Sequence, residues 1–463
     1  TNAGLIQGTS VAGIYLNASA LTGGIDNAGT ISGGQYGIYV NNGSTLAGGV
    51  TNSGSIGGGA YGIYVNGVST IDGSILNSGV ISGGTLSPYS IFVGTGSTIT
   101  GSIINAGTVS GSQYGLELAG SYAFGINNIG SLSGTSAGIY LNVATLTGVL
   151  GNTGVVNGGT YGVLASAALL DSIDNSGTIS GTQYGLYLKS NSTLTGGLTN
   201  TGSIGGGAYG LYVDSSSTLS GGFVNAGANA TLSGGINNAG LISGTNAIWL
   251  KSQSYLNGGI DNSGSISGVH NGIYAYQSTL SGGITNAGLI QGTGVAGIYL
   301  DASALDGGID NTGTISGGRY GIYINNGSTL AGGVTNSGSI GGGTYGIYVN
   351  GSSVVDGDIL NSGVISGGTL SPYSIFVGAS SMITGSIINA GTVSGSQYGL
   401  ELAGSYAFGI NNIGSLSGTR AGIYLNVATL AGALGNTGVV NGGTFGVLAS
   451  AALLDSIDNS GTI

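Results

Sequence analysis

The sequence has no cysteine among its 463 residues, which excludes disulfide bonds and thiolate metal sites. It has a single histidine, His270, which leaves almost no material for a Ser-His-Asp triad or a histidine-ligated metal. No apolar run approaches the ~18 residues that a membrane-spanning helix requires. We therefore expect no catalytic residues, no metal, no cofactor and no membrane span in this chain.

Charge is equally scarce, because charged residues make up only 4% of the chain. Fifteen acidic residues stand against four basic ones, Lys189, Lys251, Arg319 and Arg420, for a formal net charge of −11. Isolated cations on an acidic chain offer no surface for DNA or RNA phosphates, so nucleic acid is excluded as a partner. So low a charge content is also unlike that of a highly charged disordered chain.

Glycine is abundant, at 103 residues, yet it follows no Gly-X-Y register, and proline occurs only twice. These two facts exclude collagen. The hydrophobic 40% of the chain recurs at fixed positions. The composition therefore indicates glycine at tight corners and apolar residues along a narrow core.

The chain repeats at two scales. A short repeat of about two dozen residues opens with Asn-x-Gly, and most openings are 23 to 25 residues apart, with a spacing of 28 after Asn77 and of 13 after Asn225. A long repeat of 284 residues aligns 1–179 with 285–463 without gaps, and 161 of the 179 pairs are identical. Both chain ends fall inside a short repeat, which predicts a window from a longer array. A supersecondary unit repeated at this period is typical of a solenoid.

Each short repeat contains three stretches with strand character, for example 30–32, 37–40 and 44–50. Alternation of period two, β-branched residues and glycine or asparagine boundaries favour strands, and no stretch carries a helical stripe. Hairpins within each repeat are one possible arrangement. Stacking is favoured instead, because equivalent positions keep their chemistry from repeat to repeat. Three apolar columns illustrate this: Ile6, Ile31, Ile56 and Ile81; Ile14, Ile38, Ile63 and Ile91; and Leu21, Leu46, Ile71 and Ile99.

The predicted fold is therefore all-β, a single continuous parallel β-helix (β-solenoid). We expect about three short strands per rung of about 24 residues and about nineteen rungs. Residues 1–284 form the first long repeat, and residues 285–463 form an incomplete second copy, continuous with the first.

The asparagine of each Asn-x-Gly has two interpretations. It can be an ordinary corner residue that tolerates left-handed backbone, or its side-chain amide can donate to the equivalent amide one rung away, as in cross-β ladders. Its recurrence in every repeat favours the ladder. The candidate ladder residues are Asn27, Asn52, Asn77, Asn105, Asn128, Asn152, Asn175 and Asn200.

The second strand places one residue per rung outward, and that position is nearly always aromatic. An exposed aromatic stripe could hold glycans or a neighbouring fibre, although tyrosine also suits strands and shields backbone. Glu117 and Leu164 interrupt the column. The candidate contact stripe is Tyr15, Tyr39, Tyr64, Phe92, Tyr140, Tyr187, Tyr212, Trp249, Tyr274 and Tyr299.

The first strand has an outward pair of small residues, often Thr or Ser, such as Thr30 and Ser32. A flat hydroxyl array can bind ice, but Leu, Val and Gly break the lattice here. Such a face also suits lateral packing of two fibres. A β-helix glycan hydrolase or lyase would require a carboxylate pocket, for which Asp171, Asp174 and Asp214 are the candidates.

Two irregular places and five charge changes give further expectations. Extra residues around Pro88 and Pro372 should bulge outward at a corner, and the 13-residue repeat at Asn225 should produce an enlarged coil over 200–238 with a protruding loop. Between the long copies, five substitutions introduce charge, and an unpaired charge cannot be buried, so all five should face water. They are Asn17 to Asp301, Thr22 to Asp306, Gln35 to Arg319, Ser74 to Asp358 and Ser136 to Arg420.

Runs such as 51–65 (TNSGSIGGGAYGIYV) and 265–268 (SISG) resemble the repeats of bacterial autotransporter passengers and filamentous-haemagglutinin-like exoproteins. The resemblance covers the whole chain. It implies a right-handed parallel β-helix, secretion across the outer membrane and a position at the surface of a Gram-negative bacterium, as an adhesin or stalk.

The function expected from the sequence is thus a structural extracellular fibre or stalk that supports adhesion, cell–cell contact or biofilm. The alternatives are a glycan-binding adhesin that uses the aromatic stripe, a β-helix polysaccharide-degrading enzyme and an ice-binding protein. The expected partners are other copies of the chain, end-to-end or lateral, and cell-surface glycans.

Overall fold

The computed structural model describes residues 1–86, 89–122, 124–213, 217–219, 231–232, 236–256, 258–369, 373–406 and 408–463. The chain divides into two compact units, Thr1–Phe223 and Val224–Ile463. Strands account for 63% of the described residues, which include no helix. The predicted bulges at Pro88 and Pro372 lie outside the described residues, as do 214–216, 220–230 and 233–235 of the predicted coil over 200–238.

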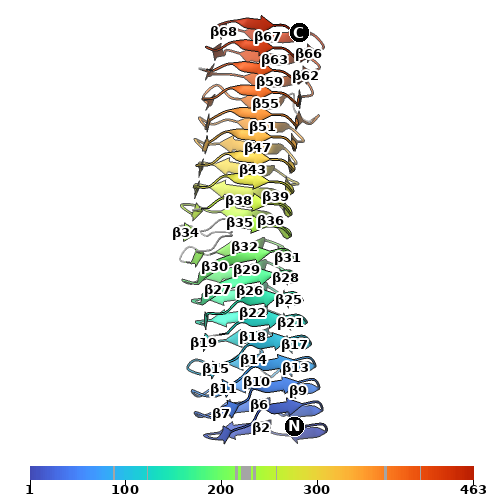
Figure 1. The fold of residues 1–463 in the computed structure, drawn as a ribbon, viewed down its shortest axis with the longest axis vertical. Coiled ribbons are helices and arrows are strands. Elements are labelled where there is room, and N and C mark those ends of the chain that lie inside the picture. Colours follow the sequence, from blue (N-terminus) through green and yellow to red (C-terminus); the bar gives the residue numbers. More distant parts are fainter. Residues whose placement is uncertain are drawn as a thin grey trace. The chain divides into compact units, whose positions relative to one another are not determined.

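Each turn of the N-terminal unit contains up to four short strands in a fixed order (Figure 1). The first strands are β1 (Leu5–Gly8), β5 (Thr30–Gly33), β9 (Ser55–Gly58), β13 (Val80–Gly83), β17 (Thr108–Gly111), β21 (Ser131–Gly134), β25 (Val155–Gly158), β28 (Thr178–Gly181) and β31 (Ser203–Gly206). The second strands are β2 (Ala12–Asn17), β6 (Tyr36–Asn41), β10 (Tyr61–Val65), β14 (Tyr89–Val93), β18 (Tyr114–Leu118), β22 (Ala137–Asn142), β26 (Tyr161–Ser166), β29 (Tyr184–Lys189) and β32 (Tyr209–Val213).

The third predicted stretch usually divides into two strands. The third strands are β3 (Ala20–Leu21), β7 (Thr45–Ala47), β11 (Thr70–Asp72), β15 (Thr98–Ile99), β19 (Ser121–Tyr122), β23 (Thr145–Leu146) and β33 (Thr218–Leu219). The fourth strands are β4 (Ile25–Asn27), β8 (Val50–Asn52), β12 (Ile75–Asn77), β16 (Ile103–Asn105), β20 (Ile126–Asn128) and β24 (Leu150–Asn152). Between β7 and β8 the chain turns at Gly48 and Gly49, whose φ angles of 89° and 77° favour glycine. The two strands stay joined in β27 (Leu169–Asn175) and β30 (Thr193–Asn200), as the sequence predicts.

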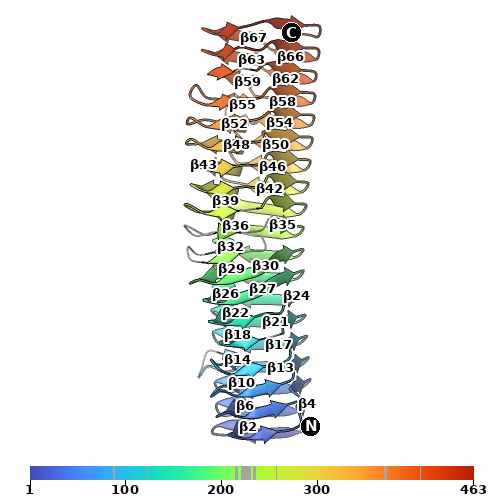
Figure 2. The ribbon, with the colours of Figure 1, turned by 60° about the vertical axis from the view of Figure 1, so that its left-hand side comes forward.

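The C-terminal unit repeats this order from β34 (Thr231–Leu232) to β69 (Ile457–Asn459). Its first two strands are joined in β36 (Leu241–Leu250) and β39 (Ser265–Tyr276), and its later second strands are β43 (Ala296–Asp301), β47 (Tyr320–Asn325), β51 (Tyr345–Val349), β55 (Tyr373–Val377), β59 (Tyr398–Leu402), β63 (Ala421–Asn426) and β67 (Phe445–Ser450). Figure 2 shows the first strands β42 (Leu289–Gly292), β46 (Thr314–Gly317), β50 (Ser339–Gly342) and β54 (Val364–Gly367) as a column beside them.

The strand pairs of the described residues are parallel and join like positions of successive turns, which confirms the predicted β-solenoid. The turns are about 25 residues long and number about 17, fewer than the nineteen expected. The junction between the long repeats is not a structural boundary, because β41 (Ile284–Asn286) pairs with β38 (Ile260–Asn262) on one side and with β45 (Ile309–Asn311) on the other. The hand of the coil stays a prediction.

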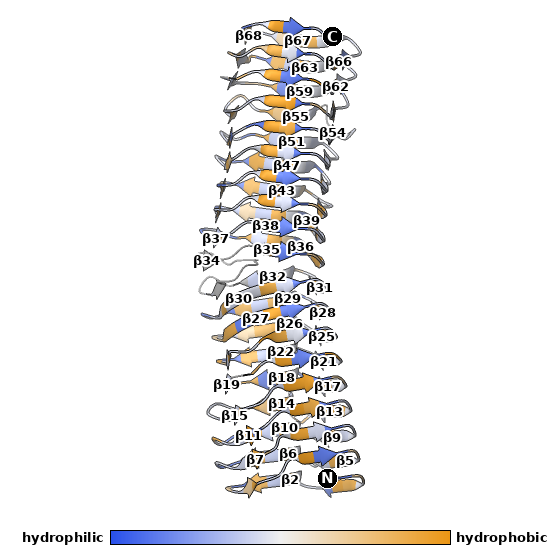
Figure 3. Cartoon of the chain, in the orientation of Figure 1, coloured by the Kyte–Doolittle hydropathy of each residue, from blue (hydrophilic) through white to orange (hydrophobic). Residues whose placement is uncertain are grey.

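The core is a set of apolar columns between the strand stacks. Ile31, Ile56 and Ile81 pair rung to rung in the first strands and are fully buried, and the second and third predicted columns are in register in the same way. Figure 3 shows hydrophobic and hydrophilic segments alternating within the turns. Burial of each such side chain contributes about 1.5–3 kcal/mol, so the core depends on exact stacking of like residues.

The asparagines of the Asn-x-Gly motifs form a hydrogen-bonded ladder inside each unit. The Asn27 Nδ2 donates to Asn52 Oδ1 at 2.7 Å, and the Asn52 Nδ2 donates to Asn77 Oδ1 at 2.8 Å. The contact repeats through Asn105, Asn128, Asn152, Asn175 and Asn200, and in the C-terminal unit from Asn238 to Asn459. Its members in the N-terminal unit from Asn27 onward are at most 3% exposed.

The ladder also binds the main chain. The Asn27 carbonyl accepts from the Ser53 and Gly54 amides of the next turn, and its Nδ2 also donates to the carbonyls of Gly29 and Ser55. No ladder asparagine in the described part of the chain has a positive φ, so the left-handed corner interpretation does not apply. The ladder continues unchanged through the 28-residue turn, where Asn77 Nδ2 lies 2.8 Å from Asn105 Oδ1. Register therefore holds at this position while the length of the turn varies elsewhere.

Replacing Asn128 by Ala should loosen the turns on both sides of it. The substitution removes the acceptor of the Asn105 amide and the donor to Asn152, and each buried group left without a partner costs about 1–3 kcal/mol. We expect backbone amides of residues 103–156 to exchange hydrogen about thirtyfold faster, which corresponds to about 2 kcal/mol. The neighbouring exposed Asn127→Ala is the control, and equal exchange in both variants would show that the ladder does not hold the register.

Candidate functional site

The most extensive candidate surface consists of two aromatic columns on the second strands, here called the tyrosine face. One column is the predicted stripe. The other holds the tyrosine three residues before the stripe position. Six of these tyrosines begin a Tyr-Gly-x-Tyr motif: Tyr36, Tyr61, Tyr184, Tyr209, Tyr320 and Tyr345. The others are Tyr89, Tyr114, Tyr161, Tyr373 and Tyr398, whose fourth residue is Phe, Glu or Leu. This second column is absent from the sequence-based prediction.

The rings of the tyrosine face stack on one another. Tyr15 and Tyr39 have centroids 4.7 Å apart and planes 5° from parallel, and Tyr36 lies 4.4 Å from Tyr39 in its own turn and 5.4 Å from Tyr61 in the next. The C-terminal unit repeats this pattern, with 4.4 Å between Tyr299 and Tyr323. Each such pair contributes about 0.5–1.5 kcal/mol beyond its buried area. Most ring faces are therefore in contact with other rings.

This stacking changes the exposure predicted for the stripe. Tyr15 is 46% exposed, but the other nine predicted residues, namely Tyr39, Tyr64, Phe92, Tyr140, Tyr187, Tyr212, Trp249, Tyr274 and Tyr299, are only partly exposed. The stripe residues beyond the first turn are thus half-covered, because the second column packs beside them, and a contact role for the stripe stays a prediction. Burial and the neighbouring phenols raise the pKa of Tyr64 to about 12, so its hydroxyl stays neutral.

Strict alternation explains why the second column was missed. Counting by twos from the inward Ile38 places Tyr36 inside the core. In β6 the alternation breaks at Gly37, because Gly37 and Ile38 are both buried and Tyr36 faces outward. The recurrence of the Tyr-Gly-x-Tyr motif was the feature of the sequence that could have predicted this second column.

Glu117 occupies a stripe position on β18 and is only 2% exposed, although an outward residue is expected there. Its neighbours in the column are Phe92 and Tyr140. Asn142 Nδ2 donates to Glu117 Oε1 at 3.0 Å, whereas Oε2 has no partner among the described residues. Burial raises the pKa of the Glu117 carboxyl, and hydrogen bonding to Asn142 and Tyr89 offsets this only in part.

The second long repeat contains the same arrangement. Glu401 is also 2% exposed, accepts from Asn426 Nδ2 at 3.0 Å and has its Oε2 without a partner in the described part of the chain. Burial raises the pKa of its carboxyl too. Each long repeat therefore carries a buried glutamate at the same position of its tyrosine face.

The five charges introduced between the long copies test the outward assignment. Asp306, Arg319, Asp358 and Arg420 are exposed, as expected, and the Arg420 guanidinium lies 5.7 Å from the centre of the Tyr398 ring. Asp301 is an exception.

Asp301 is only 8% exposed, so the prediction that it faces water is wrong. It ends β43 on the tyrosine face, where Asn326 Nδ2 donates to its Oδ1 at 2.6 Å and the Tyr274 hydroxyl lies 3.2 Å from its Oδ2. The sequence argument assumed an unpaired charge, whereas neighbouring turns supply hydrogen-bond donors.

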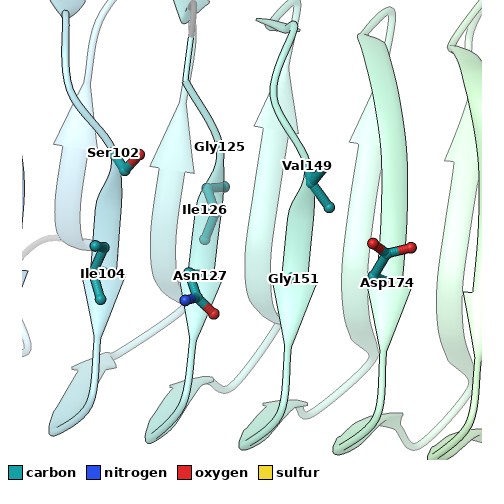
Figure 4. Close-up of a pocket in the computed structure, with 8 residues that line it drawn as sticks. All are labelled: Ser102, Ile104, Gly125, Ile126, Asn127, Val149, Gly151 and Asp174. Atoms are coloured by element: carbon teal, nitrogen blue, oxygen red, sulfur yellow. The ribbon is translucent and has the colours of Figure 1, made fainter.

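A depression of about 480 Å³ lies on the outer side of the fourth strands. The middle residues of successive fourth strands form a row along this side, and in the depression the row consists of Ile104, Asn127, Gly151 and Asp174. These four residues pair in register across four successive turns (Figure 4). Ser102, Gly125, Ile126 and Val149 complete the lining. The C-terminal unit has a counterpart of about 280 Å³ lined by residues exactly one long repeat later: Ser386, Ile388, Gly409, Ile410, Asn411, Ala433 and Gly435.

The described residues contain no group of three or more His, Cys, Asp or Glu side chains placed to hold a metal ion. Asp171 and Asp174 both lie on β27, and the third predicted acid, Asp214, lies outside the described residues. No helix long and apolar enough to cross a bilayer occurs in the described ranges.

In comparisons with known proteins, no protein-family model, curated protein or solved structure matches the chain.

Replacing the two buried glutamates, in the double variant Glu117→Gln/Glu401→Gln, should remove their contribution to the pH dependence of stability. Because the folded-state pKa is raised, the folded chain binds these protons more tightly than the unfolded chain. The cost of burying an ionised carboxylate is absent below the pKa of the unfolded chain, where both states are protonated. This cost develops as pH rises through the folded-state pKa, and the folded chain loses stability. We expect the wild type to lose thermal stability from acid to neutral pH, and the variant to melt higher than wild type only at neutral pH.

Thermal melts followed by circular dichroism across that range measure the effect. The control is Asp26→Asn/Asp310→Asn, which neutralises two exposed acids at equivalent positions of the long repeats. If the difference in melting temperature between the wild type and the glutamine variant were the same at every pH, the buried glutamates would not cause the pH dependence.

Proposed function

We propose that the chain is part of a structural extracellular fibre or stalk at the surface of a Gram-negative bacterium, where it supports adhesion, cell–cell contact or biofilm. The observation that carries the proposal is the in-register stack within each unit, in which parallel strands, apolar columns and the asparagine ladder join neighbouring turns. A repeat that buries its core only against adjacent repeats suits a stiff, extended element.

The surface chemistry agrees with an extracellular structural role. Only four Lys or Arg residues occur in the chain, so trypsin-like proteases have few sites. Asparagine amides and backbone groups in the ladder are buried and hydrogen-bonded, which removes them from attack except through local opening. These properties favour persistence outside the cell.

The alternative of a glycan-binding adhesin that uses the tyrosine face has weaker support. A saccharide packs its C–H groups against the face of an aromatic ring, and here most faces are stacked on other rings at 4.4–5.6 Å. An ice-binding role is disfavoured by the first-strand row, since Val80 and Val155 interrupt its hydroxyls. Other copies of the chain remain the partners that we propose.

Antibodies raised against the chain should label intact, unpermeabilised cells of the source. Deletion of the coding region should reduce cell–cell aggregation and surface attachment, because the stalk would be lost. Immunogold electron microscopy and an aggregation assay measure both effects, with reintroduction of the intact coding region as the control. Labelling that requires permeabilisation would overturn the proposal.

A further inference from the structure

The depression around Gly151 contains a glycine that the fold does not require. Most glycines in the stack are obligatory: a Cβ at Gly111, for example, would lie 1.9 Å from the Tyr114 carbonyl oxygen. A Cβ at Gly151 would meet nothing closer than Asn127 Oδ1 at 3.6 Å, which is ordinary contact, and its φ is not positive. The equivalent Gly435 has its nearest atom, Asn411 Oδ1, at 3.7 Å.

Such openness is unusual among the described glycines. Among the glycines whose surroundings are described, and apart from the N-terminal Gly4 and Gly23, only Gly151 and Gly435 combine free space of this size with an ordinary φ. Glycine is a poor strand former, and within a strand it often marks a place where another group approaches the backbone. The row tolerates a large residue elsewhere, because Leu76 occupies the equivalent position two turns before Asn127. The missing side chain thus opens the depression rather than relieving a clash.

The groups around the gap suggest the ligand's chemistry. Asn127 and Asp174 are exposed on either side of Gly151, and neither side chain hydrogen-bonds to another residue in the described part of the chain. An amide that both donates and accepts, opposite a carboxylate that accepts, matches an array of hydroxyl groups. Ile104 and Val149 add an apolar wall for C–H groups.

We propose that this depression, once in each long repeat, binds a neutral saccharide, with its hydroxyls between Asn127 and Asp174 and its C–H face over Gly151. A cation is a poorer match, because a single solvent-exposed carboxylate contributes little binding energy. The proposal goes beyond the structural role and does not depend on it. It also places glycan binding away from the tyrosine face.

The test uses the full chain and the double variant Gly151→Leu/Gly435→Leu, which fills both depressions. A printed array of neutral hexose and N-acetylhexosamine oligosaccharides identifies a bound saccharide, and calorimetric titration then measures its affinity. We expect the double variant to lose at least about tenfold in affinity. The matched control, Thr51→Leu/Thr335→Leu, changes the same row outside the depressions and should bind like wild type.

A second variant, Asn127→Ala/Asn411→Ala, removes the amide without adding bulk and should weaken binding even if the leucine variant folds poorly. Trp249 fluorescence should not change on binding, because Trp249 belongs to the tyrosine face. The proposal is overturned if wild type binds no saccharide, if both variants bind normally, if Trp249 emission responds, or if only a lysine-rich peptide binds in a salt-dependent manner.

Discussion

Register between successive turns is the constraint on which the rest of the structure depends. A turn of about 25 residues buries too little to fold alone, so its core exists only where like side chains of neighbouring turns coincide. The asparagine ladder fixes that coincidence at one point per turn, through side-chain and main-chain hydrogen bonds together. The apolar columns, the tyrosine face and the depressions all inherit their alignment from it.

The strongly repeated features could be predicted from the sequence. The parallel stack, the core columns and the candidate ladder all follow from residues that keep their identity at a constant spacing, since stacking is the arrangement that uses such identity. Splitting of the third stretch was not predicted, because the consecutive Gly48 and Gly49 were interpreted as part of a strand rather than as a turn with positive φ.

Features that depend on contacts between turns were harder to predict. Tyr36 faces outward only because alternation fails at Gly37, and Glu117 and Asp301 are buried because rings and amides from adjacent turns cover and bind them. A one-dimensional pattern of inward and outward positions contains no information about which outward side chains cover one another. The depression was missed for the same reason, since Gly151 resembles every other glycine until its surroundings are known.

The ladder that crosses residues 284 and 285 has an implication for how such a chain can change in length. Asn262, Asn286 and Asn311 bond across the junction of the two copies at 2.7 Å, the same distance as within a copy. A duplication that begins and ends at the same position of a turn therefore creates no foreign interface, because the new neighbours already match in shape and hydrogen bonding. Recombination between near-identical blocks can then lengthen or shorten the array by whole turns. Selection can act on the length of the array directly, because the new chain folds without compensating substitutions.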